Sequence, residues 1–152
     1  MVSWGPISLA GRMFGVQELM VEMIQSPEKV KNLIGFATEL AWAFHRPLLE
    51  EGVLNVMAIA DAAASGDLIS RKFYEEFVVP PMKELNSRVK KLGGHLLLHT
   101  CGNMADRLDL IAEEGVTCFT FDTNVPMAQA KKALAGKVCV AGNVHPTEVM
   151  LK

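Results

Sequence analysis

The residues best suited to chemistry lie in LLLHTCGN, residues 96–103, where an apolar run ends in a histidine and a cysteine. His99 and Cys101 are two positions apart, so their side chains point to the same face of an extended chain. Imidazole and thiolate are common zinc ligands, at about 2.0–2.1 Å and about 2.3 Å respectively. The spacing therefore predicts that His99 and Cys101 are part of a metal site, although HxC alone is a short motif.

Polar residues also follow the neighbouring apolar runs: Asp61, Asp122, Asn143 and His145. In parallel α/β folds the carboxyl ends of the strands gather on one side of the sheet, where active sites form. Asp122 and His145 are therefore candidates for completing the metal site. The alternative remains open, because Asp and Asn also cap helices and turns, and His145 precedes a proline.

The other two cysteines, Cys118 and Cys139, each stand near the start of an apolar run. At about 3.3 Å per residue, that places them roughly 10–13 Å from the strand ends where His99 and Cys101 lie. We expect both to be small core residues rather than metal ligands. His95 lies at the opposite end of its strand from Cys101, and His45 falls within a helical pattern.

Apolar runs alternate with helical patterns along the whole chain. Strands are expected at 5–10, 53–60, 95–99, 118–122 and 138–143. Helices are expected from 14 to 25, from Pro27 to about Gly52, from Ser70 to about 92, at 104–114 and at 126–135. Pro47 should distort the last turns of the second helix, and Pro80-Pro81 should kink or interrupt the third. A further helix start follows His145.

Near-continuous apolar strands separated by helices predict a parallel sheet in an α/β fold. Two architectures fit this order: an open doubly wound sheet, or part of a (β/α)8 barrel. Five β/α units in 152 residues agree with a barrel, in which eight units take about 250 residues. GRMFG after the first strand is not a glycine-rich phosphate loop, which an open sheet tends to have there. We therefore predict a partial (β/α)8 TIM barrel of about five parallel strands. Residues 1–152 would form a single incomplete domain that lacks the first strands and the last.

The composition narrows the class of protein. Half of the 152 residues are hydrophobic and 21% are charged, with a net charge of -2, which gives no electrostatic argument for nucleic acid or an anionic membrane. No apolar run is long enough to span a bilayer, and no secretory signal is visible at the N-terminus. Three cysteines offer no paired disulfide framework, so we expect a cytoplasmic protein with free or metal-bound thiols.

The chain resembles the uroporphyrinogen decarboxylase superfamily, which also contains cobalamin-dependent methyltransferases acting on coenzyme M. The stretches that carry the resemblance occur in family order and cover nearly the whole chain: GPISLAGRMFG, SPEKV, ADAAASGDLISRKFYEEFVVPPMKEL, HLLLHTCGN, FTFDTNVPMAQAKKAL and VAGNVHPTEVM. HTCGN resembles the zinc site of the methyltransferase branch, where an HxC pair is followed by GN and by a distant cysteine. That third ligand would fall beyond Lys152.

The resemblance implies a (β/α)8 barrel and a zinc-dependent transfer of a methyl group from a methyl-corrinoid to a thiol such as coenzyme M, with a corrinoid protein as a possible partner. Asp122 or His145 would complete the zinc shell or support His99. Arg12 and Asp61 would contact the substrate, with Arg12 facing a sulfonate or carboxylate, and Asn103 and Asn143 are further substrate-binding candidates.

Two alternatives stay open. One is uroporphyrinogen decarboxylase, acting on a tetrapyrrole in heme biosynthesis, but none of the key decarboxylase groups can be identified in these residues. The other is a non-catalytic barrel fragment or assembly module. A piece with unpaired strand edges and apolar faces is expected to self-associate and to be inactive by itself.

Overall fold

The computed structural model describes residues 2–151, which form one five-stranded sheet. The strands are β1 (Val2–Trp4), β2 (Val56–Ala60), β3 (His95–Thr100), β4 (Cys118–Phe121) and β5 (Cys139–Ala141). All neighbouring pairs are parallel, and the order β1-β2-β3-β4-β5 follows the chain. A doubly wound sheet reverses its strand order at a switch point. The sequential order therefore confirms part of a barrel rather than the open-sheet alternative.

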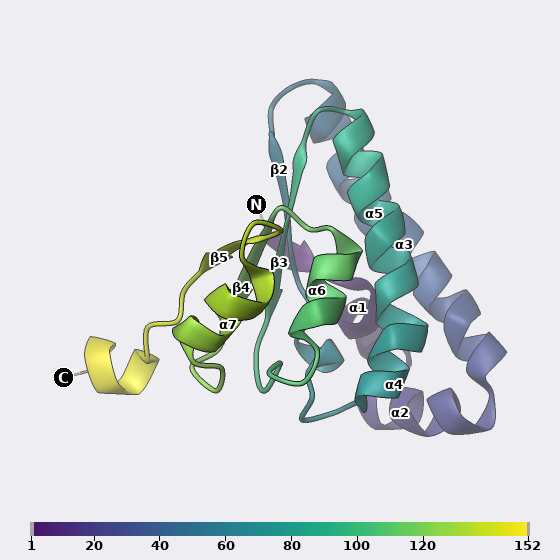
Figure 1. Cartoon of the computed structure of the whole chain (residues 1–152). Coiled ribbons are helices and arrows are strands. Elements are labelled where there is room, and N and C mark those ends of the chain that lie inside the picture. The colour runs from purple at the N-terminus through teal and green to yellow at the C-terminus, as the bar shows by residue number, and fades with distance from the viewer. Residues whose placement is uncertain (1, 152) are drawn as a thin grey trace.

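Helices connect successive strands, and α3 and α5 pack side by side along the sheet (Figure 1). The longer helices are α1 (Pro6–Phe14), α2 (Val16–Gln25), α3 (Pro27–Glu50), α5 (Val79–Lys91), α6 (Leu108–Glu114) and α7 (Met127–Leu134). Short turns of helix are η1 (Ala62–Ala64), α4 (Arg71–Phe73), η2 (Tyr74–Val78) and η3 (Pro146–Met150). Within residues 2–151, no helix is long and apolar enough to cross a membrane.

The strand predicted at residues 5–10 is wrong. The first strand is β1, at Val2–Trp4, and the apolar run after it forms helix α1. Pro6 occupies the first helical position, where its fixed φ suits a helix and its missing N–H costs nothing. The next backbone N–H groups, of Ile7 and Ser8, donate to the two carboxylate oxygens of Asp61 at 3.1 and 2.7 Å. A distant carboxylate thus stabilises the start of this helix.

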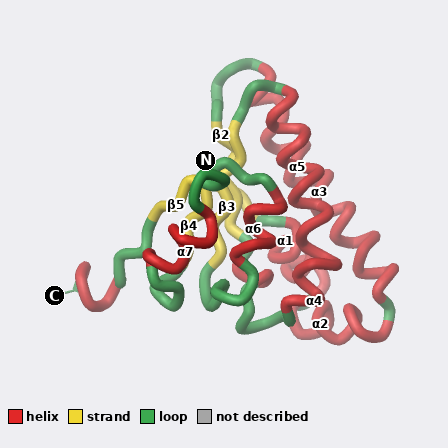
Figure 2. The backbone as a smooth tube through the Cα atoms, viewed as in Figure 1, coloured by secondary structure: helices red, strands yellow, loops and turns green. Residues whose placement is uncertain are grey.

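The other predicted elements are confirmed within a few residues. The start signal at Ser26-Pro27 opens α3, which accommodates Pro47 and runs to Glu50. Ser70 caps the next helix by accepting the Phe73 N–H at 3.2 Å. The expected interruption near Pro80-Pro81 occurs one turn earlier, as the wide helical turn η2 that immediately precedes α5. Strands appear in yellow, between helices, in Figure 2.

The two faces of the sheet have different environments. On β3 and β4 one face is buried under the helices and includes Leu96, Leu98, Phe119 and Phe121. The alternating residues of the same strands are only partly buried: Leu97, His99, Cys118 and Thr120. This second face, which corresponds to a barrel interior, is not covered by any helix of the described residues.

An apolar surface also runs along α3 and the β1 edge. Phe36, Leu40 and Phe44 recur at four-residue intervals on α3 and are 45–59% exposed. Beside them lies a groove of about 440 Å³, lined by residues that include Trp4 and Phe44. Exposed patches of this kind promote association.

We expect the purified 152-residue chain to form dimers or larger species that bury this surface and the edge strand. Size-exclusion chromatography with light scattering would measure the mass, and Phe44→Glu should shift it toward the monomer because a carboxylate resists burial. Lys72→Glu, on the short helix α4, is the matched control. A stable monomer at high protein concentration would contradict the prediction.

Candidate functional site

His99 and Cys101 meet at the carboxyl end of β3. His99 is partly buried in the strand, and Cys101 is exposed just beyond its last residue, Thr100. The side chains share one face, as the two-residue spacing predicts, and His99 Nε2 lies 3.1 Å from Cys101 Sγ. The structure thus brings together two groups that could hold one metal ion.

Thr120 orients the His99 ring from the neighbouring strand. The two residues are opposite each other in the β3–β4 register, and His99 Nδ1 lies 2.8 Å from Thr120 Oγ1. With the Nδ1–H donating to the hydroxyl oxygen, the Nε2 lone pair is free for a metal ion beside Cys101. Thr120 was not predicted from the sequence. Its only local signal is its position two residues before Asp122, on the same face of β4.

The loop after Cys101 is held by two carboxylates. The Gly102 N–H donates to Asp122 Oδ2 at 3.3 Å, and the Asn103 N–H donates to Asp67 Oδ2 at 3.0 Å. Gly102 has φ +77°, and a Cβ there would lie 2.3 Å from Asp67 Oδ2. Only glycine therefore allows this approach between the two loops.

Arg107 in turn supports the loop that carries Asp67. Its side chain is 1% exposed, and Nη2 donates to the Ile69 carbonyl at 3.1 Å. The Gly66 N–H donates to the Asn103 carbonyl at 2.9 Å, which ties the two loops together. Asp67 and Arg107 were also missed, because nothing in the local sequence pairs residues about 40 positions apart.

Asp122 places a negative charge next to the pair. The N–H groups of Thr123 and Gly102 hold the pKa of its carboxyl below the ordinary value. Burial, and then the Asp122 charge, raise the pKa of the Cys101 thiol. The negative charge of Asp122 favours a cation at this position. Both Asp122 oxygens already accept hydrogen bonds, from Thr123 and Gly102. The carboxylate therefore stabilises the loop beside His99 and Cys101.

His145 lies in a different part of the molecule. Its Nδ1 accepts the Glu148 N–H at 3.2 Å and so caps η3, which projects away from the sheet in Figure 1. Asn143 donates to the Val125 carbonyl at 2.6 Å and thereby holds the loop that follows β4. Within residues 2–151, no group of three or more His, Cys, Asp or Glu side chains could hold a metal ion.

The remaining substrate candidates have separate environments. Asp61 is fully buried, and its carboxylate faces α1, although its backbone N–H donates to the His99 carbonyl at 2.8 Å. The Arg12 guanidinium is exposed and lies 3.7 Å above the centre of the Trp4 ring. Asn103 Oδ1 accepts the Ala105 N–H at 3.0 Å, which shapes the loop after Cys101.

The two remaining thiols lie away from this site, at the starts of β4 and β5. Cys118 is partly buried and Cys139 is exposed, so neither is packed in the core of the described residues. That corrects the expectation of two core cysteines. The physical reason is that both strands present these positions to the open face of the sheet.

Comparison with known proteins identifies relatives of the whole chain. A family model described as uroporphyrinogen decarboxylase (URO-D) matches residues 1–152. The chain is 30% identical to a methylated-thiol–coenzyme M methyltransferase of Methanosarcina mazei, over 95% of this chain and 38% of that protein. It is 28% identical to the methylcobamide:CoM methyltransferase MtbA of Methanosarcina acetivorans, over 96% and 42%. A uroporphyrinogen decarboxylase of Myxococcus xanthus is 27% identical, over 95% and 44%.

A solved structure has the same fold. It is a methyltransferase from Methanosarcina mazei, which superposes with a TM-score of 0.86 at 26% identity and covers 94% of this chain and 42% of that one. The chain thus spans about two fifths of the length of the relatives it matches. The parallel order of the five strands and this overlap both indicate that the chain is a portion of a larger barrel.

Proposed function

Because the chain belongs to the uroporphyrinogen decarboxylase family, we propose that its residues form part of a zinc-dependent methyltransferase. The reaction moves a methyl group from a methyl-corrinoid to a thiol such as coenzyme M, in a reducing, cytoplasmic compartment. The observation that carries the proposal is the 3.1 Å approach of His99 Nε2 to Cys101 Sγ at the strand end. The reaction class is supported by the relatives named for methylcobamide and coenzyme M.

The donor set fits zinc. Imidazole and thiolate are both zinc ligands, and a hydrogen bond to the second ring nitrogen is the usual support for a histidine ligand. His99 and Cys101 would supply two ligands, with Asp122 beside them. Since residues 2–151 contain no group of three ligands, we propose that a further ligand comes from outside them. His145 would reach the site only through movement of the segment after β5.

A zinc ion held there would act as a Lewis acid that favours the thiolate form of a substrate thiol. Other residues of this chain hold the two proposed ligands in position. Thr120 sets the orientation of His99, and Asp67 with Asp122 fixes the backbone that carries Cys101. Arg12, exposed near Trp4, is the proposed contact for an anionic substrate group, and the corrinoid carries the methyl group itself.

The first test is metal binding by the 152-residue chain, in which water or a second copy of the chain would supply the remaining ligands. Loaded with cobalt(II) in place of zinc, the chain should show a thiolate-to-metal charge-transfer band, and elemental analysis of the zinc form should find bound zinc. Cys101→Ala should abolish both signals, whereas Cys118→Ser, which changes a thiol about four strand positions away, should retain them. Equal metal content in the wild-type and Cys101→Ala chains would contradict the assignment.

The reaction itself is tested in a chimera. Residues 1–152 would replace the matched segment of the Methanosarcina mazei methyltransferase, which supplies the rest of the barrel. We expect methyl transfer from methylcobalamin to coenzyme M that is lost in the Cys101→Ala chimera. Turnover of uroporphyrinogen without methyl transfer would instead support the decarboxylase alternative.

A further inference from the structure

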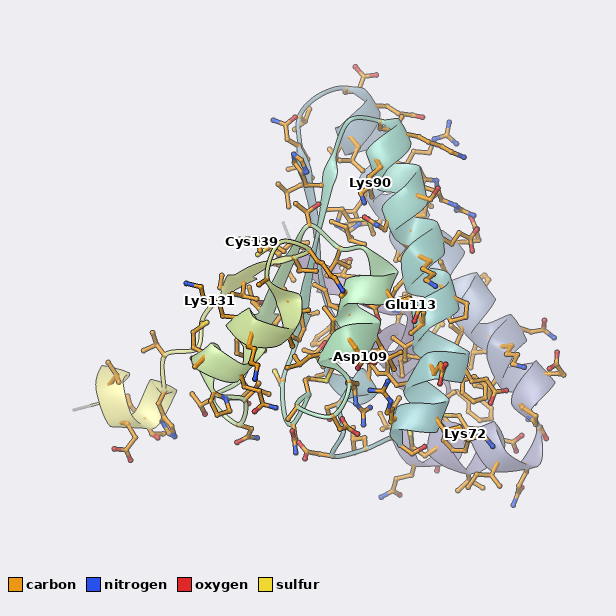
Figure 3. The ribbon with its side chains drawn as sticks, in the orientation of Figure 1. Lys72, Lys90, Asp109, Glu113, Lys131 and Cys139 are labelled. Carbon is orange, nitrogen blue, oxygen red and sulfur yellow. The ribbon has the colours of Figure 1, made fainter. Side chains whose placement is uncertain are left out.

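Cys118 and Cys139 lie directly opposite each other at the other end of the sheet from His99 and Cys101. They are paired positions in the parallel register of β4 and β5. Cys118 is partly buried, and Cys139 is exposed on the edge strand β5, where Figure 3 labels it. Opposed residues of neighbouring strands point to the same face, so the two thiols are neighbours on the open side of the sheet.

The spacing of the two backbones is within the range of a disulfide bond. Neighbouring strands are about 4.7–4.9 Å apart, and bridged cysteines usually have Cα atoms about 4.4–6.8 Å apart. We propose that Cys118 and Cys139 form a reversible redox pair that is oxidised to a disulfide by small organic disulfides. This site is independent of the proposed methyl transfer, and its bond would link the three-residue edge strand β5 to the neighbouring strand β4.

The reaction proceeds in two exchanges. The exposed Cys139, as a thiolate, attacks one sulfur of the small disulfide, forms a mixed disulfide and releases one small thiolate. Cys118 then loses its proton to water and attacks the Cys139 sulfur, which releases the second small thiolate. Two protein thiols are oxidised, and one small disulfide is reduced to two thiols.

The electrostatics of the pair agree with this order of attack. The pKa of the Cys118 thiol is raised to about 11 by burial, by the Cys139 charge and by a hydrogen bond with Cys139. The last two causes disappear once the Cys139 sulfur is in a mixed disulfide. Cys118 is therefore a poor first nucleophile and becomes a better one for the second step.

Selectivity for this pair follows from the strand register. Cys118 is opposite Leu97, four positions before Cys101, which places Cys101 roughly 13 Å further along the sheet at about 3.3 Å per residue. The folded chain therefore holds Cys101 out of reach of both partners. An unfolded chain has no such restriction and should form all three pairings.

The test is oxidation of the folded chain with oxidised glutathione, followed by thiol blocking and a non-reducing tryptic map. Cleavage after lysine and arginine places the three cysteines on separate peptides: 92–107, 108–131 and 138–152. We expect a product without cross-links between chains, lighter by two hydrogens, in which peptides 108–131 and 138–152 of the same chain are joined. Cys101→Ser should leave this product unchanged, and the same oxidation in denaturant should give mixed pairings.

The single-cysteine variants separate the two steps. Cys118→Ser should lose the joined peptides completely and accumulate glutathione on Cys139, whereas Cys139→Ser should lose them without comparable glutathione on Cys118. Glutathione retained on Cys139 of the folded wild-type chain with no joined peptides would overturn the proposal. Peptide 92–107 joined as often as in denaturant would overturn it as well.

Discussion

Asp61→Ala is expected to lower the free energy of unfolding by about 2–3 kcal/mol, since it removes the acceptor of two buried N–H groups at the start of a helix. The carboxylate of Asp61 accepts the N–H groups of Ile7 and Ser8, and the residue is fully buried. Denaturant unfolding followed by circular dichroism would measure the change. Asp67→Ala, which removes an exposed carboxylate that accepts one N–H, is the matched control and should cost less.

The pH dependence of stability gives an independent check on Asp61. Burial is the main cause that raises the pKa of its carboxyl from 3.8 to about 6, against the hydrogen bonds from Ser8 and Ile7. Between these values the folded chain binds more protons than the unfolded chain. The contribution of Asp61 to the free energy of unfolding therefore falls as the pH rises from about 4 to 6. Two pKa units correspond to roughly 3 kcal/mol.

The Asp61→Asn variant has no carboxyl at this position, so its free energy of unfolding should lack this part of the pH dependence. The free energy of unfolding of the wild type, relative to that of Asp61→Asn, should therefore decrease between pH 4 and pH 7. A difference that stays constant over this range, or increases with pH, would show that the carboxyl is not held in a desolvated environment. Both proteins share all the other titrating carboxylates, so their contributions cancel in the comparison.

The same contact explains the one strand that was predicted wrongly. GPISLA is short and apolar, so its pattern fits a strand or a buried helix equally well. The deciding partner, Asp61, lies more than 50 residues later in the sequence, and its carboxylate meets the helix only in the folded structure. Elements with strong local signals, such as the Ser26-Pro27 helix start, needed no such partner and were predicted correctly.

The residues of the candidate site also fall into two groups, those that the sequence predicts and those that depend on contacts between distant segments. The proximity of His99 and Cys101 follows from the period of an extended chain, so the sequence alone predicts it. Thr120 depends on the register between β3 and β4, and Asp67 depends on how two loops fold against each other. Neither relation has a period or a fixed spacing. The proposed ligands could thus be predicted from one strand, but the residues that orient them could not.

Thr120→Val should weaken zinc binding by about 10–100-fold, the usual cost of removing a group that supports a metal-bound histidine. Valine has nearly the shape of threonine and suits a strand, so the fold should be retained. Without the hydroxyl, His99 Nδ1 loses its partner at 2.8 Å, and the ring is free to rotate its Nε2 away from Cys101. Competition with a chelator of known affinity would measure the dissociation constant.

Two controls isolate the hydroxyl of Thr120. Thr120→Ser keeps an oxygen in reach of His99 Nδ1 and should bind zinc with nearly the wild-type affinity. Thr117→Val makes the same change three residues earlier, where the hydroxyl lies 3.5 Å from Nδ1 of His95 at the far end of β3, and should have little effect. If Thr120→Val bound zinc as tightly as the wild type while Cys101→Ala did not, the orientation of His99 would have to come from elsewhere. A loss in Thr120→Val that Thr120→Ser restores would instead mean that a hydrogen bond between neighbouring strands prepares the histidine for the metal.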